Sequence, residues 1–329
     1  MKLMRFILLI LVFIRSTLCW GKEVAHSYQH MEKGEDSFLT FQTEEMSIFG
    51  VFDGHGGKQV SQELKELIPF HLVGQLEPQG PPEQVIEAIQ KKFKEIDTQL
   101  QSEFGSIPGS TCVMVLRLGM HFYLINLGDS KGVFYKDKVK VAETTFHSFA
   151  NSKEQKLLET RMAKGSYKLV ESWCPRVLSE ADITMAFSPY LQFYDYYSRE
   201  RYSYSPSRLF GHSIWPEDTH KVVPEIQVIP IEHGSTYEFV LMSDGVSDMI
   251  SSTGELEPFF QDSQPAQKIV EFSLARWQKP WNYLLAKNIF FPNQKLEVFA
   301  TYGGEPYVLE GLQDTLEADD ITAVYGSFS

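Results

Sequence analysis

The chain has 329 residues, of which 43% are hydrophobic and 22% are charged, and its formal net charge is −13. This length is enough for one large domain or two small ones with a substantial core. The acidic balance argues against nucleic acid or an anionic membrane surface as the main partner. It does not exclude a phosphorylated substrate, because bound metal ions would reverse the local field.

Residues 1–19 are typical of a secretory signal peptide. Lys2 and Arg5 precede the unbroken apolar run 6–14, and small residues follow up to Cys19. The run is too short to cross a bilayer, which takes roughly 20 residues, so a signal anchor is the weaker alternative and no stable membrane anchor is expected. Cleavage after Cys19 would leave residues 20–329, with a destination outside the cell or in the lumen of the secretory pathway.

Apolar periodicity predicts a mixture of helices and short strands along residues 20–329, without an internal repeat or a domain boundary. Helical spacing predicts helices over 58–68, 83–101, 152–163, 265–278 and 281–290. Short apolar runs between polar turns predict strands over 24–31, 37–41, 46–52, 111–118, 121–127, 132–135, 138–142, 222–231, 235–242 and 321–325.

Two cysteines lie beyond the leader, Cys112 and Cys174. Cys112 is part of the apolar run 111–118, which favours a position in the core. The sequence leaves open whether the two residues pair, and two cysteines do not make a disulfide scaffold.

Acidic residues stand where several predicted strands begin or end. Asp53 and Asp244 each follow an apolar run, whereas Asp36 and Asp319 precede one. Antiparallel pairing of such strands would place all four carboxylates at one sheet edge. Clustered carboxylates repel one another unless cations neutralise them, and hard divalent ions such as Mg²⁺ or Mn²⁺ prefer oxygen ligands.

Two glycine-containing motifs allow both a structural and a chemical interpretation. The pair Asp53-Gly54 alone is most simply a turn, but His55 between glycines is not required by a turn and favours chemistry. The triplet Gly128-Asp129-Ser130 could hold a nucleophilic serine. A predicted strand follows it instead of the helix that such a serine requires, so a structural turn is the preferred interpretation.

Six segments in a fixed order resemble the type 2C metal-dependent protein Ser/Thr phosphatases. They are Glu35-Asp36, 49–57, Gly109-Ser110-Thr111, 126–130, 243–248 and 319–322. The resemblance covers about residues 24–327. It implies an α+β fold in which two stacked antiparallel β-sheets are flanked by helices, a four-layer α-β-β-α sandwich. It also implies removal of phosphate from serine or threonine in a phosphorylated protein substrate, with two Mg²⁺ or Mn²⁺ ions per chain.

The resemblance also implies roles for individual residues. The expected metal ligands are Asp36, Asp53, the carbonyl of Gly54, Asp244 and Asp319, with Asp53 bridging both ions. Glu35 would hold a water bound to the metal. His55 would be the general acid, because imidazole titrates near neutrality.

Several positions depart from the family pattern. An arginine is common where Met31 stands, and we expect Lys33 to bind phosphate in its place, although a lysine lacks the bidentate fork of arginine. Phe146 replaces an acid that serves a third, weaker metal, and Asp320 stands where asparagine is common. The family segment Ser-Arg-x-x-Gly-Asp aligns with residues 184–189, which lack its arginine, glycine and aspartate.

Residues 184–220 are rich in tyrosine and arginine and follow neither the strand nor the helix period. One interpretation is a partly ordered surface insertion. The other is a flap beside the active site that presents aromatic and guanidinium groups to a phosphorylated partner.

The expected function is therefore metal-dependent hydrolysis of phosphoserine or phosphothreonine in proteins, with weak or selective activity. The alternative is a catalytically inactive phosphatase-like domain that binds phosphoproteins or acts as a scaffold. A secreted calcium-binding module is less favoured, because the chain has no Asp-x-Asp-x-Asp-Gly loop. The sequence predicts no oligomeric state.

Overall fold

The computed structural model describes the backbone of residues 22–29, 33–105, 107–161, 168–179, 182–195, 200–212, 222–278, 282–283, 309–310 and 319–329. Side chains are described for 24–29, 33–105, 107–157, 205–212, 222–278 and 319–329. The expected signal peptide and Met31 lie outside these residues.

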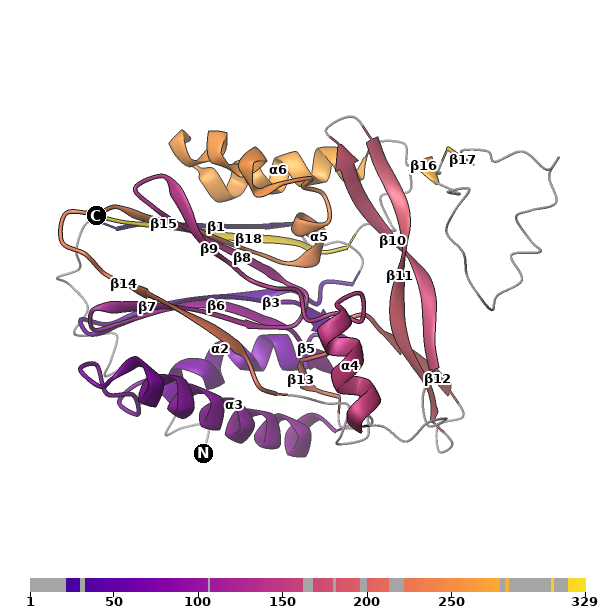
Figure 1. Cartoon of the computed structure of the whole chain (residues 1–329), viewed down its shortest axis with the longest axis horizontal. Coiled ribbons are helices and arrows are strands. Elements are labelled where there is room, and N and C mark those ends of the chain that lie inside the picture. The colour runs from indigo at the N-terminus through magenta and orange to yellow at the C-terminus, as the bar shows by residue number, and fades with distance from the viewer. Residues whose placement is uncertain are drawn as a thin grey trace.

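Two five-stranded antiparallel sheets stack face to face in the middle of the molecule (Figure 1). The first sheet has the order β1 (Lys22–Gln29), β18 (Ile321–Phe328), β15 (Tyr237–Met242), β8 (Lys131–Lys136) and β9 (Val139–Glu143). The second has the order β14 (Glu225–Pro230), β7 (His121–Leu127), β6 (Cys112–Leu118), β3 (Met46–Phe52) and β2 (Ser37–Gln42).

Helices cover the outer face of each sheet, as Figure 1 shows. The helices α2 (Gln59–Leu72) and α3 (Pro82–Phe104) pack on the second sheet, and α6 (Pro265–Trp277) packs on the first. Apolar side chains fill the space between the sheets as well as the two spaces between helix and sheet. The predicted four-layer α-β-β-α sandwich is therefore confirmed.

The central elements follow from the apolar patterns that predicted them. Every residue of β3 is buried, because the strand lies between β2 and β6 and has one face toward α2 and the other toward the opposite sheet. In α3, a single stripe from Val85 to Leu100 is buried, and a proline occupies the first turn, where its missing N–H costs nothing.

A long β-hairpin stands at one end of the sandwich (Figure 1). It consists of β10 (Lys168–Ser179) and β11 (Asp182–Asp195), to which β12 (Glu200–Tyr204) and β16 (Asn282–Tyr283) add, and β17 (Leu309–Glu310) pairs with β16. The prediction of an irregular insertion that begins at residue 184 is thus wrong, because regular pairing starts at Lys168. The helix expected over 281–290 is also wrong where it is described, since Asn282–Tyr283 is a strand.

The remaining described elements are short. They are α4 (Ser152–Arg161), β4 (Gly54–His55), β5 (Gly109–Ser110), β13 (Phe210–Gly211), α5 (Asp244–Ser247) and the 3-10 helix η1 (Thr253–Gln261). β4, β5 and β13 form a small sheet of their own. Within the described part of the chain, no helix combines the length and apolarity needed to cross a membrane.

Cys112 occupies the core position that the sequence predicts. It is fully buried in β6 and carries a free thiol, so the disulfide with Cys174 that the sequence left open is not formed. Burial raises the pKa of this thiol, which keeps it protonated and unreactive.

Candidate metal centre

Strand register brings the predicted acids to one end of the sandwich. β15 and β18 are antiparallel with Met242 opposite Ala323, so the residues just after β15 and just before β18 meet. β2 and β3 pair with Ser37 opposite Phe52, which sets the residues before β2 beside those after β3. These positions hold, in turn, Asp244, Asp319, Asp36 and Asp53.

The carboxylates of this group interact strongly because they are buried together. Burial, followed by the negative charges of neighbouring carboxylates, raises the pKa of Asp36, Asp53 and Asp244 well above the ordinary value. For Asp53 the neighbours are Asp244, Asp36, Asp319 and Asp129. Low dielectric disfavours the charged form and strengthens repulsion between like charges, so the raised pKa values report burial first and mutual repulsion second.

Each of four acids also has one buried oxygen that no hydrogen bond in the described part of the molecule satisfies. They are Oδ2 of Asp36, Oδ2 of Asp53, Oδ1 of Asp129 and Oδ1 of Asp244. Unpartnered buried polar atoms are rare in folded proteins and call for an explanation such as a bound ion. The oxygen-only donor set fits Mg²⁺ or Mn²⁺. Among the described side chains, however, no three acidic, histidine or cysteine groups already stand in a geometry that could hold an ion.

The loop that carries Asp36 is held by another acid, Asp320. The Asp320 carboxylate accepts hydrogen bonds from the backbone N–H groups of Gly34 (3.3 Å), Glu35 (2.6 Å) and Asp36 (3.3 Å). An asparagine side chain has a single, uncharged acceptor oxygen. The carboxylate has two negatively charged oxygens and accepts from all three backbone N–H groups. Asp320 therefore fixes the loop.

Gly54 has no side chain, and this allows the loop that carries Asp36 to lie close to the end of β3. A Cβ at position 54 would lie 2.5 Å from the carbonyl oxygen of Glu35 and 3.0 Å from the Ser61 hydroxyl, so only glycine fits. The close approach places Glu35 and Asp36 against Asp53 and Gly54. Burial raises the pKa of Glu35, although a hydrogen bond from the Gly57 backbone opposes the shift.

His55 lies at the rim of the acidic group. Its Nδ1 is 3.2 Å from the carbonyl oxygen of Asp53 and 3.8 Å from Asp53 Oδ1, and 23% of its side chain is exposed. A carbonyl can only accept, so Nδ1 carries the proton in this contact. The outer nitrogen, Nε2, is then the one available for proton exchange with a ligand.

Lys33 contacts the same group from outside. Its Nζ lies 3.0 Å from both carboxylate oxygens of Asp319, with 56% of the lysine side chain exposed. Burial lowers the pKa of Lys33, but the Asp319 carboxylate outweighs burial, and the net shift is upward. Lys33 thus brings a permanent positive charge to the place where the sequence predicts phosphate binding.

Asp129 is a member of the group that the sequence interpretation missed. It follows β7 and is buried, and its pKa is raised by burial. Its neighbours in the turn are structural: Ser130 Oγ is 2.7 Å from Thr111 Oγ1, which accepts a hydrogen bond from Asp53 N. The signal was present, because Asp129, like Asp53 and Asp244, comes directly after an apolar strand.

The structure corrects the alignment of the family segment Ser-Arg-x-x-Gly-Asp with residues 184–189, which belong to β11. The segment next to the site is Ser207-Arg208-Leu209-Phe210-Gly211-His212. It keeps the serine, arginine and glycine, and only the aspartate is replaced. Leu209 and Phe210 are fully buried and β13 pairs with β5, so the predicted insertion ends before this segment and not at residue 220.

The retained side chains of this segment are engaged. Arg208 forms a bidentate ion pair with Glu154 of α4, at 2.6 and 3.1 Å, and Ser207 donates to the same carboxylate at 2.7 Å. His212 is fully buried, and its ring centroid lies 6.5 Å from that of His55. Phe146, which replaces the acid of a third metal site, lies under the ammonium group of Lys131, 5.1 Å from the ring centre.

Known proteins resemble the chain in sequence over most of its length. The family model "Protein phosphatase 2C" matches residues 21–254. "Probable protein phosphatase 2C 76" of Arabidopsis thaliana is 26% identical over 245 residues, or 72% of this chain and 50% of that protein. "Probable protein phosphatase 2C 56" of rice, Oryza sativa subsp. japonica, is 27% identical over 256 residues, or 74% of this chain and 63% of that protein. The matched part is thus about half to two thirds of these relatives.

Solved structures share the fold. A serine-threonine phosphatase 2C from Toxoplasma gondii superposes with a TM-score of 0.64 at 17% identity, covering 95% of this chain and 96% of that one. A sex-determining protein of C. elegans gives 0.58 at 18% identity and covers 95% of this chain and 66% of that one. The family model spans most of the chain, and this chain therefore belongs to the protein phosphatase 2C family.

Proposed function

We propose that the chain is a metal-dependent protein Ser/Thr phosphatase with a binuclear Mg²⁺ or Mn²⁺ site. The observation that carries the proposal is the set of four buried acids, each with an unpartnered oxygen. Such a set destabilises the protein unless cations bind to it, and a cost of this kind is typical of functional sites. Family membership supports the reaction class.

The residues that would hold the ions are Asp36, Asp53 and Asp244, together with Asp319, whose charge acts on Asp53, and the backbone carbonyl of Gly54. Bound Mg²⁺ or Mn²⁺ would supply an activated water and would neutralise charge on the phosphoryl group. Asp129 adds a further carboxylate to this group. Glu35, whose backbone carbonyl lies against Gly54, would orient a water bound to the metal.

The chain's own groups account for binding and proton transfer. Lys33 places a cation at the exposed side of the acids, where a phosphate enters, and its bond to Asp319 would exchange for a bond to the substrate. His55, held through Nδ1 by the Asp53 carbonyl, would donate a proton from Nε2 to the leaving serine or threonine oxygen. The proposal requires no nucleophilic side chain.

The substrate class that follows is a phosphorylated protein, and the compartment is proposed from the leader alone. A signal peptide over residues 1–19 would deliver the enzyme to the secretory lumen or the exterior. Expression of the full chain in secreting cells tests this directly. Recovery from the medium with a new N-terminus near residue 20 supports the proposal, whereas a cytosolic protein that retains Met1 contradicts it.

The activity is tested by phosphate release from a phosphothreonine peptide with Mn²⁺, with Mg²⁺ and with chelator, alongside the Asp244→Asn variant. We expect release only with metal and a loss of release in the variant. Gln267→Ala, an exposed change on α6, serves as the control and should keep full activity.

The alternative function is a phosphatase-like protein that binds phosphoproteins without hydrolysing them. Two observations favour it: Phe146 and His212 stand where the family carries acids. Folded protein that binds the phosphopeptide but releases no phosphate with either metal would establish this alternative and overturn catalysis.

A further inference from the structure

The turn that carries Asp244 is supported from behind by α6. This turn, residues 243–250, contains only the four-residue helix α5. A helix of one turn is not stable in isolation, since nucleation costs more than one turn of hydrogen bonds returns. Its position must therefore be fixed by its neighbours.

Trp277, near the end of α6, makes the first contact with the turn. Its indole Nε1 donates to the carbonyl oxygen of Gly245 at 2.7 Å, and its side chain is buried. The N–H of Met249 bonds Val246 instead of Gly245, which leaves the Gly245 carbonyl for the indole. On the other side, a Cβ at Gly245 would overlap the carbonyl of Asp320. The residue next to Asp244 is thus held between β18 and α6.

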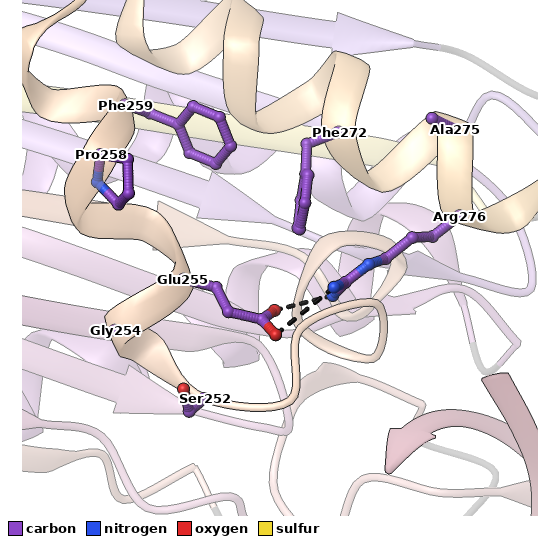
Figure 2. A pocket seen from close by; sticks show the side chains of 8 residues that line it. All are labelled: Ser252, Gly254, Glu255, Pro258, Phe259, Phe272, Ala275 and Arg276. Atoms are coloured by element: carbon purple, nitrogen blue, oxygen red, sulfur yellow. Dashed lines mark hydrogen bonds and ion pairs between the residues drawn. The ribbon is translucent and has the colours of Figure 1, made fainter. Parts of the chain in front are cut away.

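Arg276 makes the second contact. Its Nη1 donates to the carbonyl oxygen of Met249 at 2.6 Å and to Glu255 Oε2 at 2.7 Å, and its guanidinium lies 4.2 Å from the centre of the Phe272 ring. Figure 2 shows this ion pair at the wall of a pocket of about 600 Å³ between η1 and α6. The contact therefore ties both α6 and η1 to the end of the Asp244 turn.

The carbonyl groups of Gly245 and Met249 are of the kind that a helix C-terminus leaves without intrahelical partners. One side chain of α6 satisfies each of them, and neither Arg276 nor Trp277 is an acid, a metal ligand or a phosphate-binding group in the proposed site. Their contacts with the turn explain why a buried arginine and an indole N–H stand side by side at the end of α6.

We infer that Trp277 and Arg276 are positioning residues that hold the Asp244 carboxylate in place for metal binding. The inference rests on the proposed function, because it assigns these residues a role in presenting one of its ligands. They act through the turn and touch neither metal nor substrate.

The decisive experiment measures Mn²⁺ affinity by calorimetry for the full chain and for Trp277→Phe, which keeps the aromatic ring and removes the N–H. We expect roughly 10- to 100-fold weaker binding, the range found for residues that orient metal ligands. Arg276→Lys keeps the charge but loses the fork, and should weaken binding in the same direction.

The matched control is Gln267→Ala, also on α6. Gln267 accepts a hydrogen bond from Ser27 of β1 at 2.6 Å, so the change loosens the helix from the sheet without touching the Asp244 turn. Its Mn²⁺ affinity should equal that of the wild type. Equal affinity in Trp277→Phe and Arg276→Lys as well would overturn the inference.

Hydrogen exchange in chelator gives a readout that does not depend on metal. The amides of residues 246–250 should exchange roughly five- to tenfold faster in Trp277→Phe than in the wild type or in Gln267→Ala, because one hydrogen bond that restrains the turn is lost. A wild-type protein that binds no Mn²⁺ would contradict the proposed function. Unchanged amide exchange in Trp277→Phe would refute the positioning role, whether or not Mn²⁺ binds.

Discussion

The molecule contains two sets of buried charged groups, one in which like charges lie together and one in which opposite charges are paired. At the end of the sandwich, Asp36, Asp53 and Asp244 are buried side by side, and burial with mutual repulsion raises their pKa values. Behind the Asp244 turn, Glu255 is paired with Arg276. Burial tends to raise the pKa of Glu255 too, but hydrogen bonds from Arg276 and Ser251 outweigh it and the net shift is downward.

The difference lies in what offsets the charges of each set. The Glu255–Arg276 pair has its countercharge and its hydrogen bonds within the protein, so the folded state needs nothing further there. Asp36, Asp53 and Asp244 each keep one buried oxygen that has no hydrogen-bond partner among the described residues. An unpaired buried charge is costly, and under the proposed function bound cations would offset that cost.

The largest expected effect comes from removing one charge of the acidic set. Asp53→Asn should abolish metal binding and phosphate release, because Asp53 lies among four of the other acids. The same change should raise the free energy of unfolding of the metal-free protein by about 1–2 kcal/mol, since it relieves repulsion at a functional site. Chemical denaturation in chelator measures the second effect. A less stable Asp53→Asn protein would show that the aspartates do not repel one another.

Breaking the Glu255–Arg276 pair should lower the free energy of unfolding, whereas Asp53→Asn should raise it. Arg276→Met leaves Glu255 without its countercharge and should cost roughly 3 kcal/mol of unfolding free energy in chelator. Lys268→Met is the matched control, because Lys268 pairs with Glu271 in the open, at 44% and 49% exposure, and should change stability by less than about 0.5 kcal/mol. Equal costs for the two variants would contradict the contrast drawn between buried and exposed pairs.

The pH dependence of stability separates the two sets further. A carboxylate whose folded-state pKa is raised binds more protons in the folded protein than in the unfolded chain. Its contribution to the stability of the folded state is therefore complete below about pH 4. That contribution is lost as the pH rises through the raised pKa. For Glu255, whose pKa is lowered, stability is present above the unfolded value and is lost as the pH falls. In chelator, the melting temperature should therefore fall from mildly acidic pH toward neutrality.

Asp53→Asn sharpens this test, because it removes one of the raised groups. Its melting temperature should fall less over the same interval than that of the wild type, as differential scanning calorimetry would show. Parallel curves for the two proteins would assign the pH dependence to groups elsewhere in the chain.

The smallest effect concerns Lys33, which lies outside the acids. Lys33→Ala should raise the Michaelis constant for a phosphopeptide by about two- to fivefold, as expected for one partly exposed charge, and should change Mn²⁺ affinity less. Steady-state kinetics at saturating Mn²⁺ would show it. An unchanged Michaelis constant would rule out phosphate binding by Lys33.

Much of the fold could be predicted because its strands and helices carry one-sided or continuous apolar patterns. The run at β3 and the stripe of α3 are examples. The acids at strand ends predicted that Asp36, Asp53 and Asp244 would lie together. Asp129 follows an apolar strand in the same way, but its Gly-Asp-Ser triplet is also typical of a turn, so the sequence alone does not assign it to the acidic group.

Other features depend on contacts that a sequence pattern does not encode. The β10–β11 hairpin stands at the end of the sandwich, outside its two sheets (Figure 1). The segment around Arg208 was misplaced because His212 stands where the family has an aspartate. The support of the Asp244 turn joins residues 27 and 32 positions apart, Met249 with Arg276 and Gly245 with Trp277.

The most direct test of the central claim is a calorimetric titration of Mn²⁺ into the metal-free protein. If the buried aspartates are completed by cations, two ions should bind per chain, and Asp53→Asn should bind none. A folded wild-type protein that binds no Mn²⁺ and no Mg²⁺ would contradict the account, because the unpartnered carboxylates would then have no function in metal binding.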